Sequence, residues 1–184
     1  MMAKIEAGCK LADFTFDTGF ESGVKLSEKV KAADKTVLLF LRYYGCTLCQ
    51  LDMREYANAY DQFKAKNAQL LVVLQSPPST IAGQMNKGDL PYDIVCDPDM
   101  GLYKEFELGV AASKEEMIRP DDMAAFAAKR EKIAEYGMEH GAYEGEEMQF
   151  PGYFILNSDL EVLEAHRAVS ILDMPSVDEM IAKL

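Results

Sequence analysis

Short runs of consecutive apolar residues alternate along the chain with segments in which apolar residues recur every three or four positions. Three runs rich in branched and aromatic residues predict strands buried on both faces of a sheet: Val37–Leu41, Leu70–Leu74 and Ile94–Cys96. The three-to-four periodicity predicts helices at residues 26–33, from Cys49 to about Ala65, from about Thr80, and from Asp99 to Phe106. Strands that alternate with helices favour an α/β fold whose central sheet is at least partly parallel. Before them, residues 13–17 alternate polar and aromatic side chains, which predicts a half-exposed strand or hairpin arm.

This alternation stops between residues 109 and 148. Ala111–Met117 and Asp121–Tyr136 have helical character, and a glycine-punctuated loop follows them. We interpret 109–148 as a helical insertion that covers a functional site or contacts a partner, with the acidic run Glu144–Glu147 simply solvated. Beyond it, the pattern predicts a strand that Pro151 begins, an antiparallel return over 160–165 and a terminal helix from 175.

Composition limits the functions to consider. A length of 184 residues fits one domain, 1–184, and the hydrophobic and charged fractions of 49% and 27% are ordinary for a globular protein. A net charge of −12 argues against nucleic acid and anionic membrane surfaces as partners. No run of roughly 18 apolar residues predicts a membrane span. Because the segment that begins at Met1 lacks an apolar signal core, we expect a cytoplasmic protein.

The most informative feature is a pair of cysteines directly after the first buried strand. The strand leads through Arg42, Tyr43 and Gly45 to Cys46 and Cys49, at the predicted start of a helix. Unpaired backbone N–H groups and the helix dipole favour a thiolate there. Two cysteines within one helical turn can also exchange a disulfide. The spacing therefore indicates a redox dithiol.

Other roles for these cysteines remain open. They could be buried structural thiols, or half of a zinc site. Zinc would need a second pair of ligands, and the candidates Cys9, Cys96, His140 and His166 form no Cys-x-x-Cys or His-x-x-x-His pair. We expect Cys96 to be inert core, and both histidines to be surface or hydrogen-bonded core residues. No motif indicates a metal, a nucleotide or a flavin, so we expect no cofactor.

Several motifs over residues 11–184 resemble the alkyl hydroperoxide reductase/thiol-specific antioxidant (AhpC/TSA) family. The order of buried strand, Cys-x-x-Cys helix, further strand–helix units, proline, hairpin and terminal helix is that of the thioredoxin fold. The similar segments are Leu39–Cys49, Asp97–Asp99 with the helix after it, Glu144-Gly145 and Gln149–Ile155. The resemblance implies a thioredoxin-like fold, with a central mixed sheet flanked by helices and the insertion before the last hairpin.

The resemblance also implies roles for individual residues. Cys46 matches the nucleophilic, solvent-facing thiol and Cys49 the thiol that resolves its oxidised form. Pro151 matches a cis-proline that faces the dithiol, so that the backbone of Phe150 would contact a substrate across from Cys46. A trans proline that begins a strand is the alternative.

One departure from the family concerns the residues that bind the peroxide. Where classical peroxiredoxins have Pro-x-x-x-Thr-x-x-Cys, this chain has Leu39 and Tyr43, so the phenol of Tyr43 is the candidate replacement for the threonine hydroxyl. An arginine near the thiol stabilises the thiolate and the leaving oxygen. Arg42 and Arg167 are the candidates, although Arg42 could instead extend from a strand end to solvent.

We therefore expect a thiol-dependent oxidoreductase. Its substrate would be a hydroperoxide, or a protein or small-molecule disulfide, and both routes end in a Cys46–Cys49 disulfide that an external thioredoxin-like dithiol reduces. The alternative is a non-catalytic redox-sensing or protein-binding module whose contact surface is the insertion. Accessibility of Cys46 would distinguish the two. A homodimer is possible, by analogy with related proteins.

Overall fold

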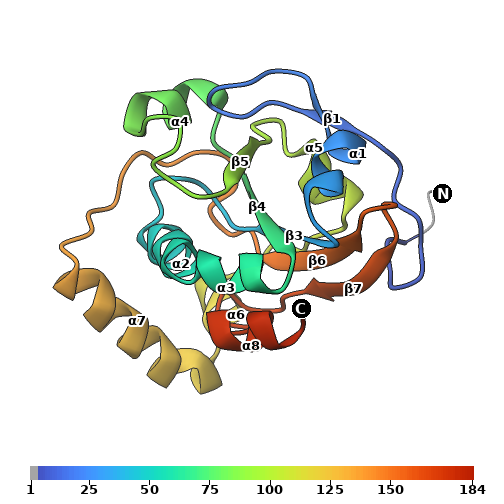
Figure 1. Cartoon of the computed structure of the whole chain (residues 1–184). Helices are drawn as coiled ribbons and strands as arrows, with labels where there is room; N and C mark the ends of the chain where they lie inside the picture. Colours follow the sequence, from blue (N-terminus) through green and yellow to red (C-terminus); the bar gives the residue numbers. More distant parts are fainter. Residues whose placement is uncertain (1–3) are drawn as a thin grey trace.

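The computed structural model describes residues 4–184, so the part of the N-terminal prediction that concerns Met1–Ala3 lies outside the described residues. Its centre is a five-stranded sheet in the order β5-β4-β3-β6-β7 (Figure 1). The strands are β3 (Lys35–Phe40), β4 (Ala68–Leu74), β5 (Asp93–Cys96), β6 (Gly152–Asn157) and β7 (Val162–Arg167). A separate hairpin pairs β1 (Thr15–Phe16) with β2 (Val24–Lys25).

The sheet is mixed, as predicted. Strands β3, β4 and β5 run parallel, whereas β6 is antiparallel to β3 and β7 is antiparallel to β6. In this register Phe40 pairs with Gly152, so the chain before β6 lies beside the chain that leaves β3. The end of β3 and residue Pro151 are therefore brought together, although Phe40 and Pro151 are 111 positions apart in the sequence.

Alternation along the central strand divides the core into two layers. Val37 and Leu39 face one cluster, whereas Leu38 and Phe40 face the other, because successive strand side chains point to opposite faces. The elements over the first face are α2 (Thr47–Asn58), α3 (Tyr60–Ala65), α4 (Pro78–Gln84) and α8 (Val177–Ala182). Those over the second are α1 (Leu26–Lys29), the 3-10 turn η1 (Val30–Ala32) and α5 (Gly101–Glu105). Figure 1 shows both layers.

The prediction of one continuous helix from Cys49 to Ala65 was wrong. The helix is interrupted at Ala59, where φ and ψ are −95° and 3°, and continues as the separate helix α3. No Gly or Pro marks this break. It accompanies the packing of Phe63, which is fully buried, with the stacked ring of Tyr60 at 6.0 Å. Asn67 has a φ of 49° just after α3, which is the left-handed conformation typical of a helix end.

The segment predicted as an insertion contains α6 (Lys114–Met117), the 3-10 turn η2 (Pro120–Asp122) and α7 (Met123–Glu135), and a long loop then leads to β6. Helix α7 has no buried residue and lies outside α2 (Figure 1). An ion pair between Lys129 and Asp52 joins the two helices, and the Arg54 guanidinium lies 4.0 Å from the ring centre of Tyr136.

The loop after α7 is anchored by an acidic residue that we expected to be solvated. Glu144 accepts a hydrogen bond from the hydroxyl of Ser76 and another, at 2.5 Å, from that of Thr80. The amide N–H of Glu146 donates to the side-chain oxygen of Gln75 at 2.5 Å. The acidic run therefore ties the loop to the junction of β4 and α4. None of the described helices has the length and apolar character needed to cross a membrane.

Candidate active site

The two cysteines lie where the backbone favours a thiolate. Cys46 is the N-cap of the 12-residue helix α2, and its sulfur accepts a hydrogen bond from the backbone N–H of Cys49 at 3.4 Å. Neither Cys46 nor Cys49 forms a disulfide in this structure. The N–H group of Cys49 is one of those that a helix leaves unpaired at its start, so the contact stabilises negative charge on Cys46.

Arg42 provides the opposite charge. Its Nη2 atom lies 2.9 Å from the sulfur of Cys46, and its Nη1 atom donates to the carbonyl of Glu147 at 2.6 Å. The hydrogen bond that the Cys49 thiol donates, followed by the charge of Arg42, outweighs burial and lowers the pKa of Cys46 to about 6. Burial and that same donated hydrogen bond raise the pKa of Cys49. At neutral pH, Cys46 is therefore the thiolate and Cys49 the protonated partner.

The prediction that Cys46 faces solvent was wrong, because only 1% of it is exposed. The loop after α7 covers it, and the N–H of Gly141 donates to the carbonyl of Gly45 at 2.8 Å. A Cβ atom on Gly45 would collide with the backbone of Gly141 and Ala142, so the absence of a side chain permits this close approach.

Cys46 instead faces a cavity of about 350 Å³. Arg42 and Tyr43 also line it, and most of its other lining residues come from the insertion. Its apolar residues are Leu48, Met117, Ile118, Phe126, Ile133, Met148 and Ile171. The cavity therefore combines a thiolate and a guanidinium with a set of apolar side chains.

Tyr43 contacts a residue that we had expected to be unrelated to the site. Its side chain is buried, and its hydroxyl lies 3.1 Å from Nε2 of His140, which is on the loop after α7. The other ring nitrogen of His140, Nδ1, lies 2.8 Å from the carbonyl of Gly141. His140 also lines the cavity. No local pattern reveals this contact, because the two residues are 97 positions apart.

Two expectations for the segment before β6 were wrong. Residues 4–184 contain no cis peptide bond, so Pro151 is trans and simply precedes the strand. It lines a small space beside Cys49. The backbone N–H of Phe150 donates to the carbonyl of Gly109 at 2.9 Å, and its carbonyl accepts from the Gln149 side chain at 3.1 Å. Both backbone groups are already used within the protein, so they do not form the predicted substrate contact.

The other residues considered from the sequence, Arg167, Cys96 and Cys9, do not line the Cys46 cavity. Arg167 donates to the carbonyl of Phe106 at 2.7 Å and does not line the Cys46 cavity. Cys96 is buried as expected, and burial raises its pKa to about 12. Cys9 is half-buried in the N-terminal segment. Over residues 4–184, no group of three or more His, Cys, Asp or Glu side chains is arranged to hold a metal ion.

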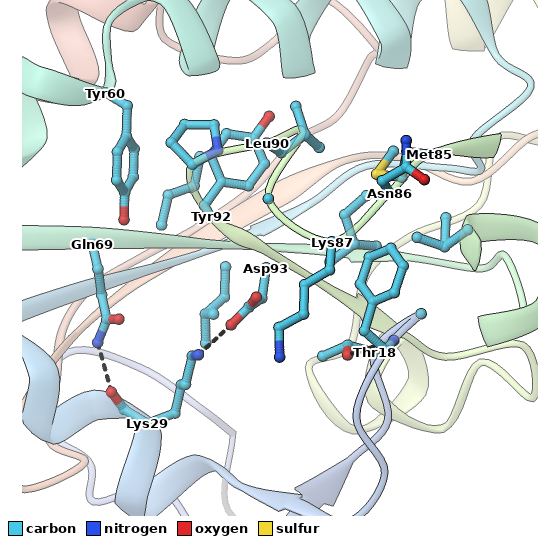
Figure 2. Close-up of a pocket in the computed structure, with 18 residues that line it drawn as sticks. Thr18, Lys29, Tyr60, Gln69, Met85, Asn86, Lys87, Leu90, Tyr92 and Asp93 are labelled. Carbon is cyan, nitrogen blue, oxygen red and sulfur yellow. Dashed lines mark hydrogen bonds and ion pairs between the residues drawn. The ribbon is translucent and has the colours of Figure 1, made fainter. Parts of the chain in front are cut away.

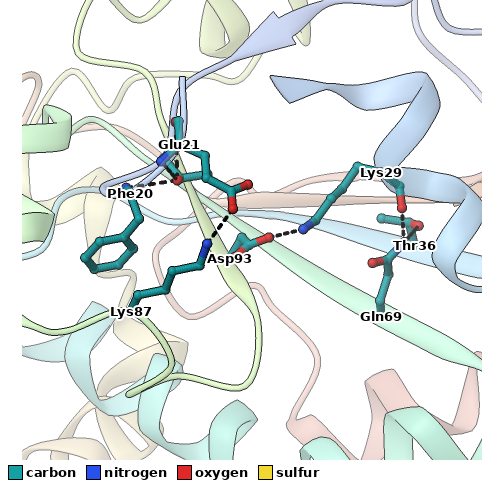
Figure 3. Close-up of polar contacts among 8 residues, drawn as sticks. Phe20, Glu21, Lys29, Thr36, Gln69, Lys87 and Asp93 are labelled. Carbon is teal, nitrogen blue, oxygen red and sulfur yellow. Dashed lines mark hydrogen bonds and ion pairs between the residues drawn. The ribbon is translucent and has the colours of Figure 1, made fainter. Parts of the chain in front are cut away.

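Figure 2 shows a second cavity, of about 280 Å³, near the starts of β4 and β5. It is separate from the Cys46 cavity, since Cys46 follows the end of β3. Its charged side chains are all paired: Lys29 with Asp93, which also lines the cavity, and Lys87 with Glu21 outside it, at 2.5 Å (Figure 3). The Gln69 amide donates to the carbonyl of Lys29 at 2.8 Å. With its charges paired and no thiol in its lining, this cavity is a weaker candidate for chemistry than the one beside Cys46.

Comparison with known proteins identifies a family that matches the sequence and solved structures that share the fold. The model of the AhpC/TSA family matches residues 7–165. The peroxidoxin BcpB of Mycobacterium tuberculosis has a similar structure, with a TM-score of 0.65, 14% identity, and coverage of 97% of this chain and 95% of that one. PrxQ of Xylella fastidiosa has a TM-score of 0.63 and 15% identity, with coverage of 98% of this chain and 96% of that one. The 2-Cys peroxiredoxin of Plasmodium vivax has a TM-score of 0.64 and 14% identity, with coverage of 96% of this chain and 78% of that one. No curated protein matches. These likenesses confirm the thioredoxin-like fold.

Proposed function

This chain belongs to the AhpC/TSA family, a family of thiol-dependent oxidoreductases, and on that premise we propose that it is a peroxidase that reduces hydroperoxides with Cys46 and Cys49. The single observation that carries this proposal is the contact of 2.9 Å between the guanidinium of Arg42 and the sulfur of Cys46, at the wall of a cavity. The guanidinium stabilises the thiolate before the reaction, and it can stabilise the charge that develops on a leaving oxygen.

The proposed reaction has two steps. The Cys46 thiolate attacks the terminal oxygen of R–O–OH, so an S–O bond forms, the O–O bond breaks and the RO⁻ group takes up one proton to leave as ROH. Cys46 becomes a sulfenic acid, and the peroxide is reduced by two electrons. The Cys49 sulfur then attacks the sulfenic sulfur, giving a Cys46–Cys49 disulfide and water. An external dithiol of the thioredoxin type reduces this disulfide and is itself oxidised.

Burial of Cys46 favours a hydroperoxide over a protein disulfide. A protein substrate must bring its own chain to the attacking sulfur, and only 1% of Cys46 is exposed. A small hydroperoxide can enter the cavity, and the apolar wall contributed by Phe126, Ile133 and Met148 suits an organic substituent. The dithiol reductant, which is larger, would need the loop after α7 to move away first.

Two further proposals concern the insertion and the oligomeric state. The cavity wall contributed by α6, α7 and the following loop supports the interpretation of 109–148 as an insertion that covers the site of a single domain. A homodimer is also proposed, by analogy with the 2-Cys relatives. Light scattering combined with size-exclusion chromatography would test it, and a monomeric mass at micromolar concentration would count against it.

The function is tested by mixing the reduced protein rapidly with hydrogen peroxide or with cumene hydroperoxide, and then analysing the cysteines by mass spectrometry. We expect a Cys46–Cys49 disulfide to form far faster than free cysteine oxidises. Cys46→Ser should abolish the reaction, while Cys49→Ser should still consume one peroxide and accumulate a sulfenic acid at Cys46. Unchanged peroxide consumption by Cys46→Ser would refute the proposal.

Thiol–disulfide exchange is the second candidate, and the Cys-x-x-Cys dithiol itself is the observation that favours it. It would be preferred if peroxide reacts slowly while a small disulfide is reduced readily. The burial of Cys46 is what the binding-module alternative expected, but family membership makes the chain an enzyme, so that alternative would need both reactions to be absent.

A further inference from the structure

His140 occupies a position from which a proton can reach the active-site cavity. Its imidazole is exposed, whereas the Tyr43 hydroxyl that it contacts belongs to a side chain that is only 1% exposed. Both residues line the cavity that contains Cys46. A residue in contact with water is therefore joined, through a single hydrogen bond of 3.1 Å, to the hydroxyl of a buried residue that lines the same cavity as the reacting sulfur.

The hydrogen bonds around His140 determine which way its protons point. The carbonyl of Gly141 can only accept, so Nδ1 of His140, 2.8 Å away, carries a proton. In a neutral imidazole Nε2 is then an acceptor, and the Tyr43 hydroxyl proton points at His140 rather than into the cavity. When His140 is protonated, Nε2 donates to Tyr43, and the proton of Tyr43 is available to a substrate oxygen.

The surrounding loop holds the imidazole in this position. The ring of Tyr143 lies 4.3 Å from that of His140, and the side chain of Gln50 donates to the carbonyl of Glu139 at 3.3 Å. The contact between Gly141 and Gly45 described above fixes the next residue. The charged groups that line the same cavity are Arg42, Cys46, Lys114, Arg130 and Glu147.

Resting on the proposed peroxidase function, we propose that His140 is a positioning residue that supplies, through the Tyr43 hydroxyl, the proton taken up by the leaving oxygen of the hydroperoxide. As the O–O bond breaks, RO⁻ takes the proton of Tyr43, and Tyr43 takes the Nε2 proton of His140. The imidazolium becomes a neutral imidazole and is recharged from water, so no tyrosinate accumulates. Burial raises the pKa of Tyr43, which makes a tyrosinate costly and this resupply useful.

Leaving groups of different basicity test this proposal. tert-Butyl hydroperoxide expels a strongly basic alkoxide that needs a proton, whereas peracetic acid expels acetate, which does not. The rate constant for oxidation of Cys46 is measured with each peroxide, and their ratio is compared between proteins. His140→Gln keeps a polar group beside Tyr43 but cannot supply a proton. We expect the ratio for tert-butyl hydroperoxide over peracetic acid to fall about 100-fold, the low end of what general acid catalysis contributes.

Further variants test whether His140 and Tyr43 act together on one proton path. Tyr43→Phe should lower the same ratio, and the double variant should lower it no further than either single change, because both act on one proton path. His166→Gln is the matched control, since that imidazole contacts the carbonyl of Asp173 at 2.7 Å and does not line the cavity. The control should keep the wild-type ratio.

The outcomes separate this inference from the proposed function. If wild type oxidises Cys46 with both peroxides but His140→Gln slows the two reactions equally, the proton path is overturned and the peroxidase function stands. The path is also overturned if the losses of the two single variants multiply in the double variant. If wild type reacts with neither peroxide, the peroxidase function fails and this inference fails with it.

Discussion

Removing the charge of Arg42 should raise the pKa of Cys46. Arg42→Met keeps a side chain of similar length but deletes both the guanidinium and its contact of 2.9 Å with the sulfur. A hydrogen bond to a charged group contributes about 1.5–3 kcal/mol, and about 1.4 kcal/mol corresponds to one pH unit, so the pKa should rise by about one to two units. Starting from about 6, it would reach about 7–8.

The consequence for activity follows from the fraction of thiolate. At pH 7 that fraction would fall from about 0.9 to between about 0.5 and 0.1. The reaction with peroxide should slow by more than this factor, because the same guanidinium also stabilises the leaving oxygen. Raising the pH would recover only the part of the loss that is due to ionisation.

The assay is alkylation of Cys46 by iodoacetamide as a function of pH, followed by mass spectrometry so that each cysteine is measured separately. Arg54→Met is the matched control, since Arg54 lies on α2 itself but its guanidinium contacts Tyr136 rather than the thiols. If Arg42→Met folds normally and its Cys46 still titrates near pH 6, or if the control shifts equally, the electrostatic role assigned to Arg42 is wrong.

Three other outcomes are expected. Folding lowers the pKa of Cys46 from an ordinary 9.0 to about 6. The free energy of unfolding of wild type, relative to that of Cys46→Ser, should therefore rise by at most about 4 kcal/mol between pH 6 and pH 9, and this gain should be lost as the pH falls toward 6. Denaturant titrations measure the difference, and a difference that does not change with pH would contradict the prediction. Gly45→Ala would press a methyl group into the loop backbone and should lower the free energy of unfolding by about 1–3 kcal/mol in thermal unfolding. The control Gly83→Ala, in an open helical position, should be neutral or slightly stabilising, and equal melting temperatures of the two variants would argue against the close approach at Gly45. Phe126→Ala should lower kcat/KM for cumene hydroperoxide about tenfold relative to hydrogen peroxide, and an unchanged ratio in steady-state assays would show that the apolar wall does not bind the substrate.

Local patterns predicted most of the fold. The buried strands at 37–41, 70–74 and 94–96 are present, because continuous apolar runs need burial on both faces, whatever the rest of the chain does. The break at Ala59 was missed, since no helix-breaking residue marks it; in the structure it coincides with the stacking of Tyr60 on Phe63. The cis form of Pro151 was also wrong, because the resemblance supplied it and no property of the local residues required it.

What the sequence by itself determined is the pair of thiols and its immediate partner. Cys46, Cys49 and Arg42 lie within eight positions at a strand-to-helix junction, so local geometry is enough to bring them together. Tertiary structure alone decided the burial of Cys46, the apolar wall of the cavity and the contact between Tyr43 and His140. Each depends on the insertion and the loop that follows α7 folding back over the helix start, and no periodicity within a single segment encodes such a contact.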